Sequence, residues 1–142
     1  MRNLVRVNEM KIVIVGEKGR PHALAGALET GGVDVERPPK SAFGAAHDDQ
    51  VGELAAALIA FERLFADDAP DAVLLVSTSN LALAAVLVAT KLQIPVAALV
   101  EGVRDEGQMS EMNRRLIEQL ADRTVTGDGA TIAASLRALI AA

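Results

Sequence analysis

The 142-residue chain contains no cysteine, tryptophan or tyrosine, and only three phenylalanines and two histidines. Without cysteine there is no disulfide framework and no thiolate metal site, and two histidines are too few for a zinc cluster. Because 51% of the residues are apolar and so few are aromatic, the core must consist of Ala, Val, Leu and Ile. Such a core suits parallel strands covered by closely packed helices. We expect no metal site and no cofactor.

Basic residues and long apolar runs are also scarce. Fourteen Lys and Arg against 19 Asp and Glu give a net charge of −5, which argues against a nucleic-acid partner. The longest apolar run, Leu81 to Ala89, is too short to span a bilayer. Residues 1–10 carry scattered charges and no long apolar stretch, unlike a signal peptide. We expect a cytoplasmic protein that binds neither nucleic acid nor membrane.

Short β-branched or aliphatic runs alternate with longer helical stretches along the chain. Strands are predicted at residues 11–15, 33–35, 72–76, 96–100 and 124–126, and a helix follows each of them. This alternation predicts an α/β fold, a doubly wound, Rossmann-like parallel sheet in a three-layer αβα arrangement. One such domain fills residues 1–142, with residues 1–10 as an extension.

Two of the predicted helices carry informative apolar patterns. The helix that Asp48 or Asp49 would cap has one apolar face, formed by Val51, Leu54, Leu58, Phe61 and Phe65. The next helix, Leu81 to Leu92, is almost wholly apolar. It is therefore buried on more than one side or lies at a subunit contact, and we expect a homo-oligomer.

Nearly all candidate functional groups lie in three turns that follow predicted strands. Ligands of open parallel sheets bind at this carboxyl edge. In the turn from Gly16 to His22, Gly19 would let the backbone approach a phosphate and Arg20 offers a fork-shaped donor. The alternative is that the glycines only shape a tight turn and Arg20 is solvated.

The turn from Ser77 to Asn80 offers hydroxyl groups. Ser77, Thr78 and Ser79 can hydrogen-bond a ligand or cap the following helix, and capping is the simpler interpretation.

The third turn, Glu101 to Arg114, combines charge with a helix start. Ser110 is the predicted N-cap and Glu111 lies in the first helical turn. Two carboxylates in one cleft can form an acid/base pair, because their pKa values are pushed apart. Alternatively, Glu101 pairs with Arg104 while Glu111 only caps its helix. Arg115 and Glu118 are predicted to form a surface ion pair.

Two segments of this third turn resemble the signature of the non-hydrolysing UDP-N-acetylglucosamine 2-epimerases. Val100 to Arg104 (VEGVR) is similar to that family's Val-Glu-Ala-Gly-Leu-Arg turn, with one residue fewer. Ser110 to Ile117 (SEMNRRLI) is similar to its Pro-Glu-Glu-x-Asn-Arg helix start, with Ser110 in place of the first glutamate. Gly19-Arg20-Pro21 resembles the family's opening Gly-x-Arg-Pro turn.

The resemblance implies roles for the matched residues. Glu101 and Glu111 would be the catalytic carboxylates, and the substrate-binding residues would be Gly19, Arg20, Ser77, Arg104, Asn113 and Arg114. One departure is prominent: the family has His-Gly-Asp-Thr where this chain has Val76 to Ser79, so that Thr78 replaces a candidate catalytic aspartate. A hydroxyl cannot act as a carboxylate base near neutral pH.

The resemblance covers only the N-terminal Rossmann-like half of these two-domain enzymes. Their second domain supplies most of the contacts that bind UDP. We therefore expect a domain that binds a nucleotide-sugar or other phosphorylated ligand, whose site a partner chain with a second Rossmann-like domain could complete. If active, it would be an epimerase-like isomerase, but not a complete one alone. The alternative is a non-catalytic interaction or regulatory domain. A third hypothesis is an unrelated flavodoxin-type or receiver-type binding domain.

Overall fold

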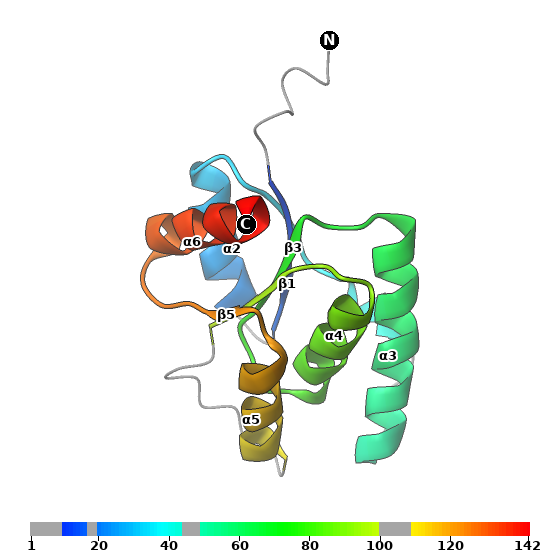
Figure 1. Ribbon diagram of the computed structural model, residues 1–142. Helices are drawn as coiled ribbons and strands as arrows, with labels where there is room; N and C mark the ends of the chain where they lie inside the picture. The colour runs from blue at the N-terminus through cyan, green and yellow to red at the C-terminus, as the bar shows by residue number, and fades with distance from the viewer. Residues whose placement is uncertain (1–9, 17–19, 44–48, 100–108) are drawn as a thin grey trace.

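The computed structural model describes residues 10–16, 20–43, 49–99 and 109–142. Five strands and five α-helices alternate in it, with one 3-10 turn (Figure 1). The elements in chain order are β1 (Lys11–Val15), α2 (Arg20–Thr30), β2 (Asp34–Glu36), η1 (Lys40–Phe43), α3 (Gln50–Asp67), β3 (Ala72–Leu75), α4 (Asn80–Lys91), β4 (Val96–Ala98), α5 (Ser110–Leu120), β5 (Arg123–Thr124) and α6 (Gly129–Ala141).

The strands form one parallel sheet in the order β2-β1-β3-β4-β5, which is a doubly wound order. The three central strands are almost entirely buried, whereas β2 and β5 at the edges are exposed or half-buried. This burial explains why the central strands are aliphatic runs. The predicted αβα fold class is confirmed.

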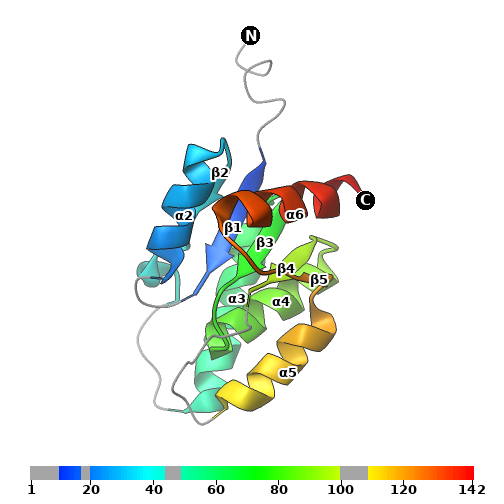
Figure 2. The same cartoon turned by 90° about the vertical axis from the view of Figure 1, so that its left-hand side faces the viewer.

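Helices cover both faces of the sheet (Figures 1 and 2). On one face α3, α4 and α5 enclose a cluster that includes Phe61, Phe65 and Val86. On the other face α2 and α6 enclose a cluster that includes Leu28, Ile132 and Leu136. The sheet therefore lies between two separate aliphatic cores.

Helix α4 is apolar because it is enclosed by the fold. Eight of its twelve residues are buried, and it packs against both α3 and α5 as well as the sheet. Burial on more than one side, the first of the two alternatives for this helix, is therefore what the structure has.

Several local predictions differ from the structure. Val51 is 76% exposed and does not join the apolar face of α3, which Phe61 and Phe65 dominate. The last strand is Arg123–Thr124 and not residues 124–126. Asp49 occupies the N-cap position of α3 but its side chain makes no capping hydrogen bond; Asp48 lies outside the described residues.

The start of α6 shows a complete cap. Asp128 is its N-cap, and the Asp128 carboxylate accepts a hydrogen bond of 2.9 Å from the Thr131 amide. Hydrogen bonds to that carboxylate, first of all from the Thr131 amide, hold the pKa of Asp128 below its usual value.

At the amino edge of the sheet, Lys11 is the centre of an acidic group. Its ammonium contacts Asp68 and lies 3.6 Å from a Glu36 carboxylate oxygen, while its backbone amide donates to Asp71. Burial lowers the pKa of Lys11, but the hydrogen bond to Asp68 and the charge of Glu36 outweigh it, so the net shift is upward. These contacts tie β1 to the last residue of β2 and to the segment before β3.

Candidate functional site

The carboxyl edge of the sheet is where the buried polar side chains gather. Among the described residues, the buried polar side chains are Ser77, Thr78, Asn80 and Asn113. The first three follow β3 and the fourth lies in the first turn of α5. All of their buried nitrogen and oxygen atoms have hydrogen-bond partners. Several of these hydrogen bonds join one helix start to another.

The turn after β3 folds its own hydroxyl groups inward. Ser77 Oγ donates to Ser79 Oγ at 2.8 Å and accepts from the Ser79 amide at 2.9 Å. Ser79 Oγ in turn accepts from the Ala82 amide at 3.3 Å, so Ser79 is the N-cap of α4. The predicted capping role of this turn is confirmed at Ser79. Ser77 is fully buried, with its hydroxyl engaged in the turn.

Asn80 connects three helices through its side-chain amide. Its Nδ2 donates to Gln50 Oε1 and Glu53 Oε1 of α3, both at 2.7 Å. Its Oδ1 accepts from Asn113 Nδ2 of α5 at 3.0 Å. Asn113 Nδ2 also donates to the Thr78 carbonyl at 3.1 Å. The first turns of α3, α4 and α5 are therefore held together at the carboxyl edge.

A second link joins α5 to the turn after β3. The hydroxyls of Thr78 and Ser110 lie 2.5 Å apart and are hydrogen-bonded. The prediction that Ser110 is the N-cap of α5 is wrong: Met109 holds that position, and no side chain caps this helix. Ser110 is instead the first helical residue, and its hydroxyl is directed to Thr78, 32 residues away in sequence.

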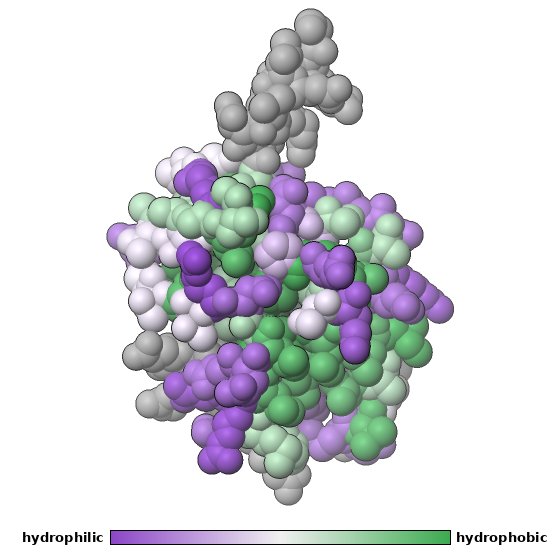
Figure 3. Space-filling model, viewed as in Figure 1, coloured by the Kyte–Doolittle hydropathy of each residue, from purple (hydrophilic) through white to green (hydrophobic). Residues whose placement is uncertain are grey.

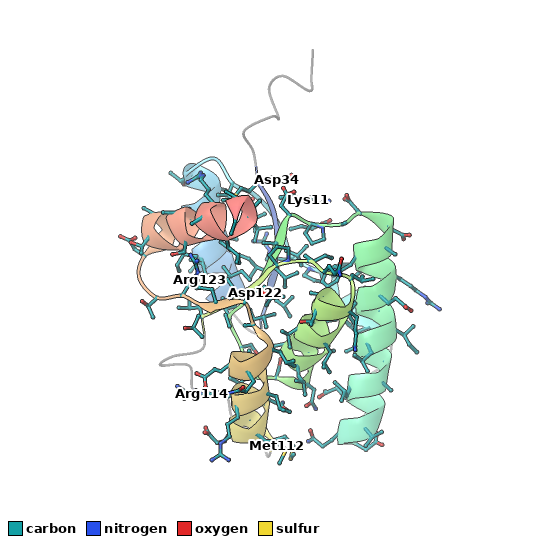
Figure 4. The ribbon with its side chains drawn as sticks, viewed as in Figure 1. Lys11, Asp34, Met112, Arg114, Asp122 and Arg123 are labelled. Carbon is teal, nitrogen blue, oxygen red and sulfur yellow. The ribbon has the colours of Figure 1, made fainter. Side chains whose placement is uncertain are left out.

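The charged candidates on α5 form ion pairs with residues one helical turn away. Glu111 and Arg115 are both exposed, and Arg115 Nε is 3.6 Å from Glu111 Oε1. Arg114 Nε lies 3.6 Å from Glu118 Oε2. The predicted pairing of Arg115 with Glu118 is therefore wrong, since each pairs with a different residue one helical turn away. Figure 4 shows Arg114 on α5, far from Lys11 at the amino edge.

The structure thus brings Ser77 and Asn113 together through Thr78. It leaves Glu111 on the exposed side of α5, and Arg114 half-buried beside Glu118. Gly19, Glu101 and Arg104 lie outside the described residues. Arg20 is the first residue of α2, and its side chain also lies outside them. Their assigned roles stay predictions.

Sequence reasoning missed the part played by Asn80. The available signal is an amide residue at the start of a largely apolar helix. Among the described residues, no group of His, Asp or Glu side chains could hold a metal ion. The buried polar side chains at this edge are hydroxyls and amides, which can orient a ligand by hydrogen bonds but cannot transfer a proton as a carboxylate would. The Glu53 carboxylate beside them accepts a hydrogen bond from Asn80.

The chain was compared with known protein families and solved structures. A profile of the UDP-N-acetylglucosamine 2-epimerase family matches residues 5–134, most of the chain. The chain belongs to the UDP-N-acetylglucosamine 2-epimerase family. The match confirms the resemblance inferred from the third turn. No curated protein sequence matches this chain.

Solved structures of UDP-N-acetylglucosamine 2-epimerases share the fold. One is similar with a TM-score of 0.67 and 20% identity, over 94% of this chain and 45% of its own. The enzyme of Methanocaldococcus jannaschii, in complex with UDP-GlcNAc and UDP, gives 0.65 and 22%, over 80% and 38%. That of Neisseria meningitidis, bound to UDP-GlcNAc, gives 0.59 and 19%, over 83% and 39%.

This chain therefore spans less than half the length of the solved epimerases that it matches. In the part of the chain that the structure describes, no helix is long and apolar enough to cross a membrane.

Proposed function

We propose that this domain binds a nucleotide-sugar or another phosphorylated ligand at the carboxyl edge of its sheet, in the cytoplasm. The observation that carries the proposal is the set of three helix starts joined there by Asn80, Asn113 and Thr78. Amide groups and helix N-termini at such an edge suit an anionic ligand. Membership of the epimerase family, in which solved relatives hold UDP-GlcNAc or UDP, supports the same ligand class.

Within this proposal Gly19, Arg20 and Arg104 contact phosphate, while Ser77, Asn113 and Arg114 order the edge around the ligand. Glu101 and Glu111 are the candidate acid/base carboxylates. Thr78 stands where the family resemblance places an aspartate, and its hydroxyl is bonded to Ser110. The domain alone is then not a complete epimerase, and a second Rossmann-like domain, on a partner chain, would complete the site.

The test is a thermal melt with UDP and with UDP-GlcNAc at millimolar concentration. A ligand that binds only the folded state raises the melting temperature by mass action. We expect both compounds to do so, and Arg20→Ala to abolish the rise. Arg63→Ala removes an exposed arginine of α3 instead and serves as the control, since it should keep the rise. No rise in the unmodified protein contradicts the proposal.

Residual isomerase activity has a separate readout. An epimerase that removes and returns the proton at carbon 2 of the sugar incorporates solvent deuterium there. We expect none from this chain alone, because the described edge offers hydroxyls in place of a carboxylate at Thr78 and Ser110. Deuterium incorporation by the purified chain would contradict the view that it is incomplete.

One observation favours a second candidate, a non-catalytic interaction or regulatory domain. The buried polar atoms at the described edge are all satisfied by partners within the chain, as expected of groups that serve the fold. A melting temperature that neither UDP nor UDP-GlcNAc shifts would favour this candidate.

A further inference from the structure

The side chains of Gln50 and Glu53 meet in the first turn of α3, at the carboxyl edge of the sheet. Both residues are exposed, and each is hydrogen-bonded through Oε1 to the same nitrogen, Asn80 Nδ2, at 2.7 Å. Figure 3, in the orientation of Figure 1, shows hydrophobic surface over the middle of the layer that α3 and α4 form. The two polar side chains lie at the end of that layer, where both helices start.

The carboxylate of Glu53 fixes the orientation of the neighbouring amides. An ionised carboxylate only accepts hydrogen bonds, so Asn80 must turn its amide nitrogen toward Glu53. The same nitrogen then requires the carbonyl oxygen of Gln50, and the oxygen of Asn80 requires a donor, which is Asn113 Nδ2 at 3.0 Å. Asn80 is 8% exposed and Asn113 4%, so the exposed pair stands on a buried support.

Two atoms of the pair have no hydrogen-bond partner among the described residues. They are Gln50 Nε2, a donor, and Glu53 Oε2, an acceptor. Because both Oε1 atoms contact one nitrogen, they are at most twice 2.7 Å apart, and the free atoms are attached to the same two carbon atoms. A donor and an acceptor are thus offered together. A hydroxyl group both accepts and donates, so it is the complement of such a pair.

The charges at this helix start disfavour a phosphate group. Glu53 is an acid of the first turn, and the side chain of Asp49, at the N-cap position, makes no capping hydrogen bond. Two carboxylates here repel an anion and offset the positive end of the helix dipole. By contrast, α2 begins with Arg20 and has no acid in its first turn. A ligand with one anionic and one uncharged end is therefore expected to turn its uncharged end toward α3.

We propose that Gln50 and Glu53 bind the uncharged, hydroxyl-bearing part of the ligand. Gln50 Nε2 donates to a ligand hydroxyl, and Glu53 Oε2 accepts from the same hydroxyl or from its neighbour on the ring. This assignment rests on the proposed function, in which the ligand is a nucleotide-sugar, and the hydroxyl belongs to its sugar or to its ribose. Asn80 and Asn113 are positioning residues for the pair.

The test uses variants that change the free atom and keep the bond to Asn80. Glu53→Gln retains an oxygen for Asn80 but replaces the free acceptor by a donor, and Gln50→Glu does the reverse. Calorimetric titration should show each binding UDP-GlcNAc about tenfold more weakly. The double variant Gln50→Glu/Glu53→Gln again offers one donor and one acceptor, so we expect it to recover most of the loss.

Glu29→Gln is the matched control, because it removes the same charge at an exposed position near the far end of α2. It should leave the affinity unchanged. UDP separates the two sources of the hydroxyl: Glu53→Gln weakens UDP as well if the group is on the ribose, and only UDP-GlcNAc if it is on the sugar. Single variants that bind UDP-GlcNAc as the unmodified chain does overturn the assignment and leave the proposed function standing. So does a double variant that recovers nothing.

A second measurement decides the case in which no nucleotide binds and the proposed function fails. The side-chain amide protons of Gln50 give their own signals in amide NMR spectra, identified by their loss in Gln50→Glu. We expect free GlcNAc or ribose, at tens of millimolar, to shift these signals, and inorganic phosphate to leave them in place. In that case, Gln50 signals that neither sugar moves overturn the assignment as well.

Discussion

The side chain of Asn80 makes contacts that no other residue type of its size could make. An amide has donors on one side and an acceptor on the other, and Asn80 uses both. It donates to Gln50 and Glu53 and accepts from Asn113, so that one residue of α4 is hydrogen-bonded to both α3 and α5. At 8% exposure it has little water to replace a lost partner.

Asn80→Leu is therefore expected to lower the free energy of unfolding. The change removes one of the two acceptors of Asn113 Nδ2 and the donor to two α3 side chains, a loss of about 1–3 kcal/mol. Urea denaturation measures it. Thr90→Ala, at an exposed position of the same helix, is the control and should change little. Equal stability of the two variants would mean that the Asn80 contacts contribute nothing.

At the scale of elements, α2 and α6 approach each other closely at one point. Gly129, the first residue of α6, faces Ala27 of α2: a Cβ atom added to the glycine would lie 2.7 Å from the Ala27 Cβ. Real Cβ atoms do not come so close, so the helices would have to separate. The absence of a side chain at Gly129 is what permits this contact.

Gly129→Ala should destabilise the protein by about 1–3 kcal/mol, the usual cost of overpacking. Ala27→Gly removes the opposing methyl group, so the double variant should recover part of that loss even though Ala27→Gly alone weakens α2. Chemical denaturation of the four proteins gives the coupling energy. Strict additivity of the two changes would contradict the contact.

The order and type of the elements were predictable from the sequence, whereas several details within them were not. Val51 belongs to the apolar periodicity of α3, but it precedes Phe61 by ten residues. At 100° per residue, Val51 points about 80° away from Phe61 around the helix axis. The buried Ala57 and Ala60 lie on the opposite side of Phe61. The periodicity is correct, and the centre of the buried stripe is set by packing against α4.

The carboxyl edge was likewise predictable as a polar region, but its hydrogen-bond partners were not. Ser110 has the residue type of an N-cap, but a hydroxyl bonds whichever partner the fold supplies, and here that partner is Thr78 of the neighbouring turn. The role of Asn80 could not be predicted for the same reason. Its three partners, Gln50, Glu53 and Asn113, are 27 to 33 residues away in sequence, beyond any local pattern.

At the scale of the whole molecule, the two helix layers are unequal. The layer of α3, α4 and α5 contains Phe61, Phe65 and the eight buried residues of α4. In the layer of α2 and α6, the described part of α2 buries only Ala25 and Leu28. Local opening of a segment costs less free energy where fewer apolar contacts must be broken.

Native-state hydrogen exchange should follow this inequality. We expect the amides of α4 and β3 to exchange slowest, near the rate set by global unfolding, and those of α2 to exchange at least roughly tenfold faster. Exchange followed by mass spectrometry on peptides from the two helices measures the difference. Equal protection of α2 and α4 would indicate a single cooperative unit.

Both border strands of the sheet are short and carry charge. β2 has three residues, of which Asp34 and Glu36 are acids, and β5 has only Arg123 and Thr124. Unpaired strand borders are templates on which other chains add to form aggregates, and brief, charged strands discourage this. A protein with half its residues apolar therefore exposes little backbone on which a fibril could start.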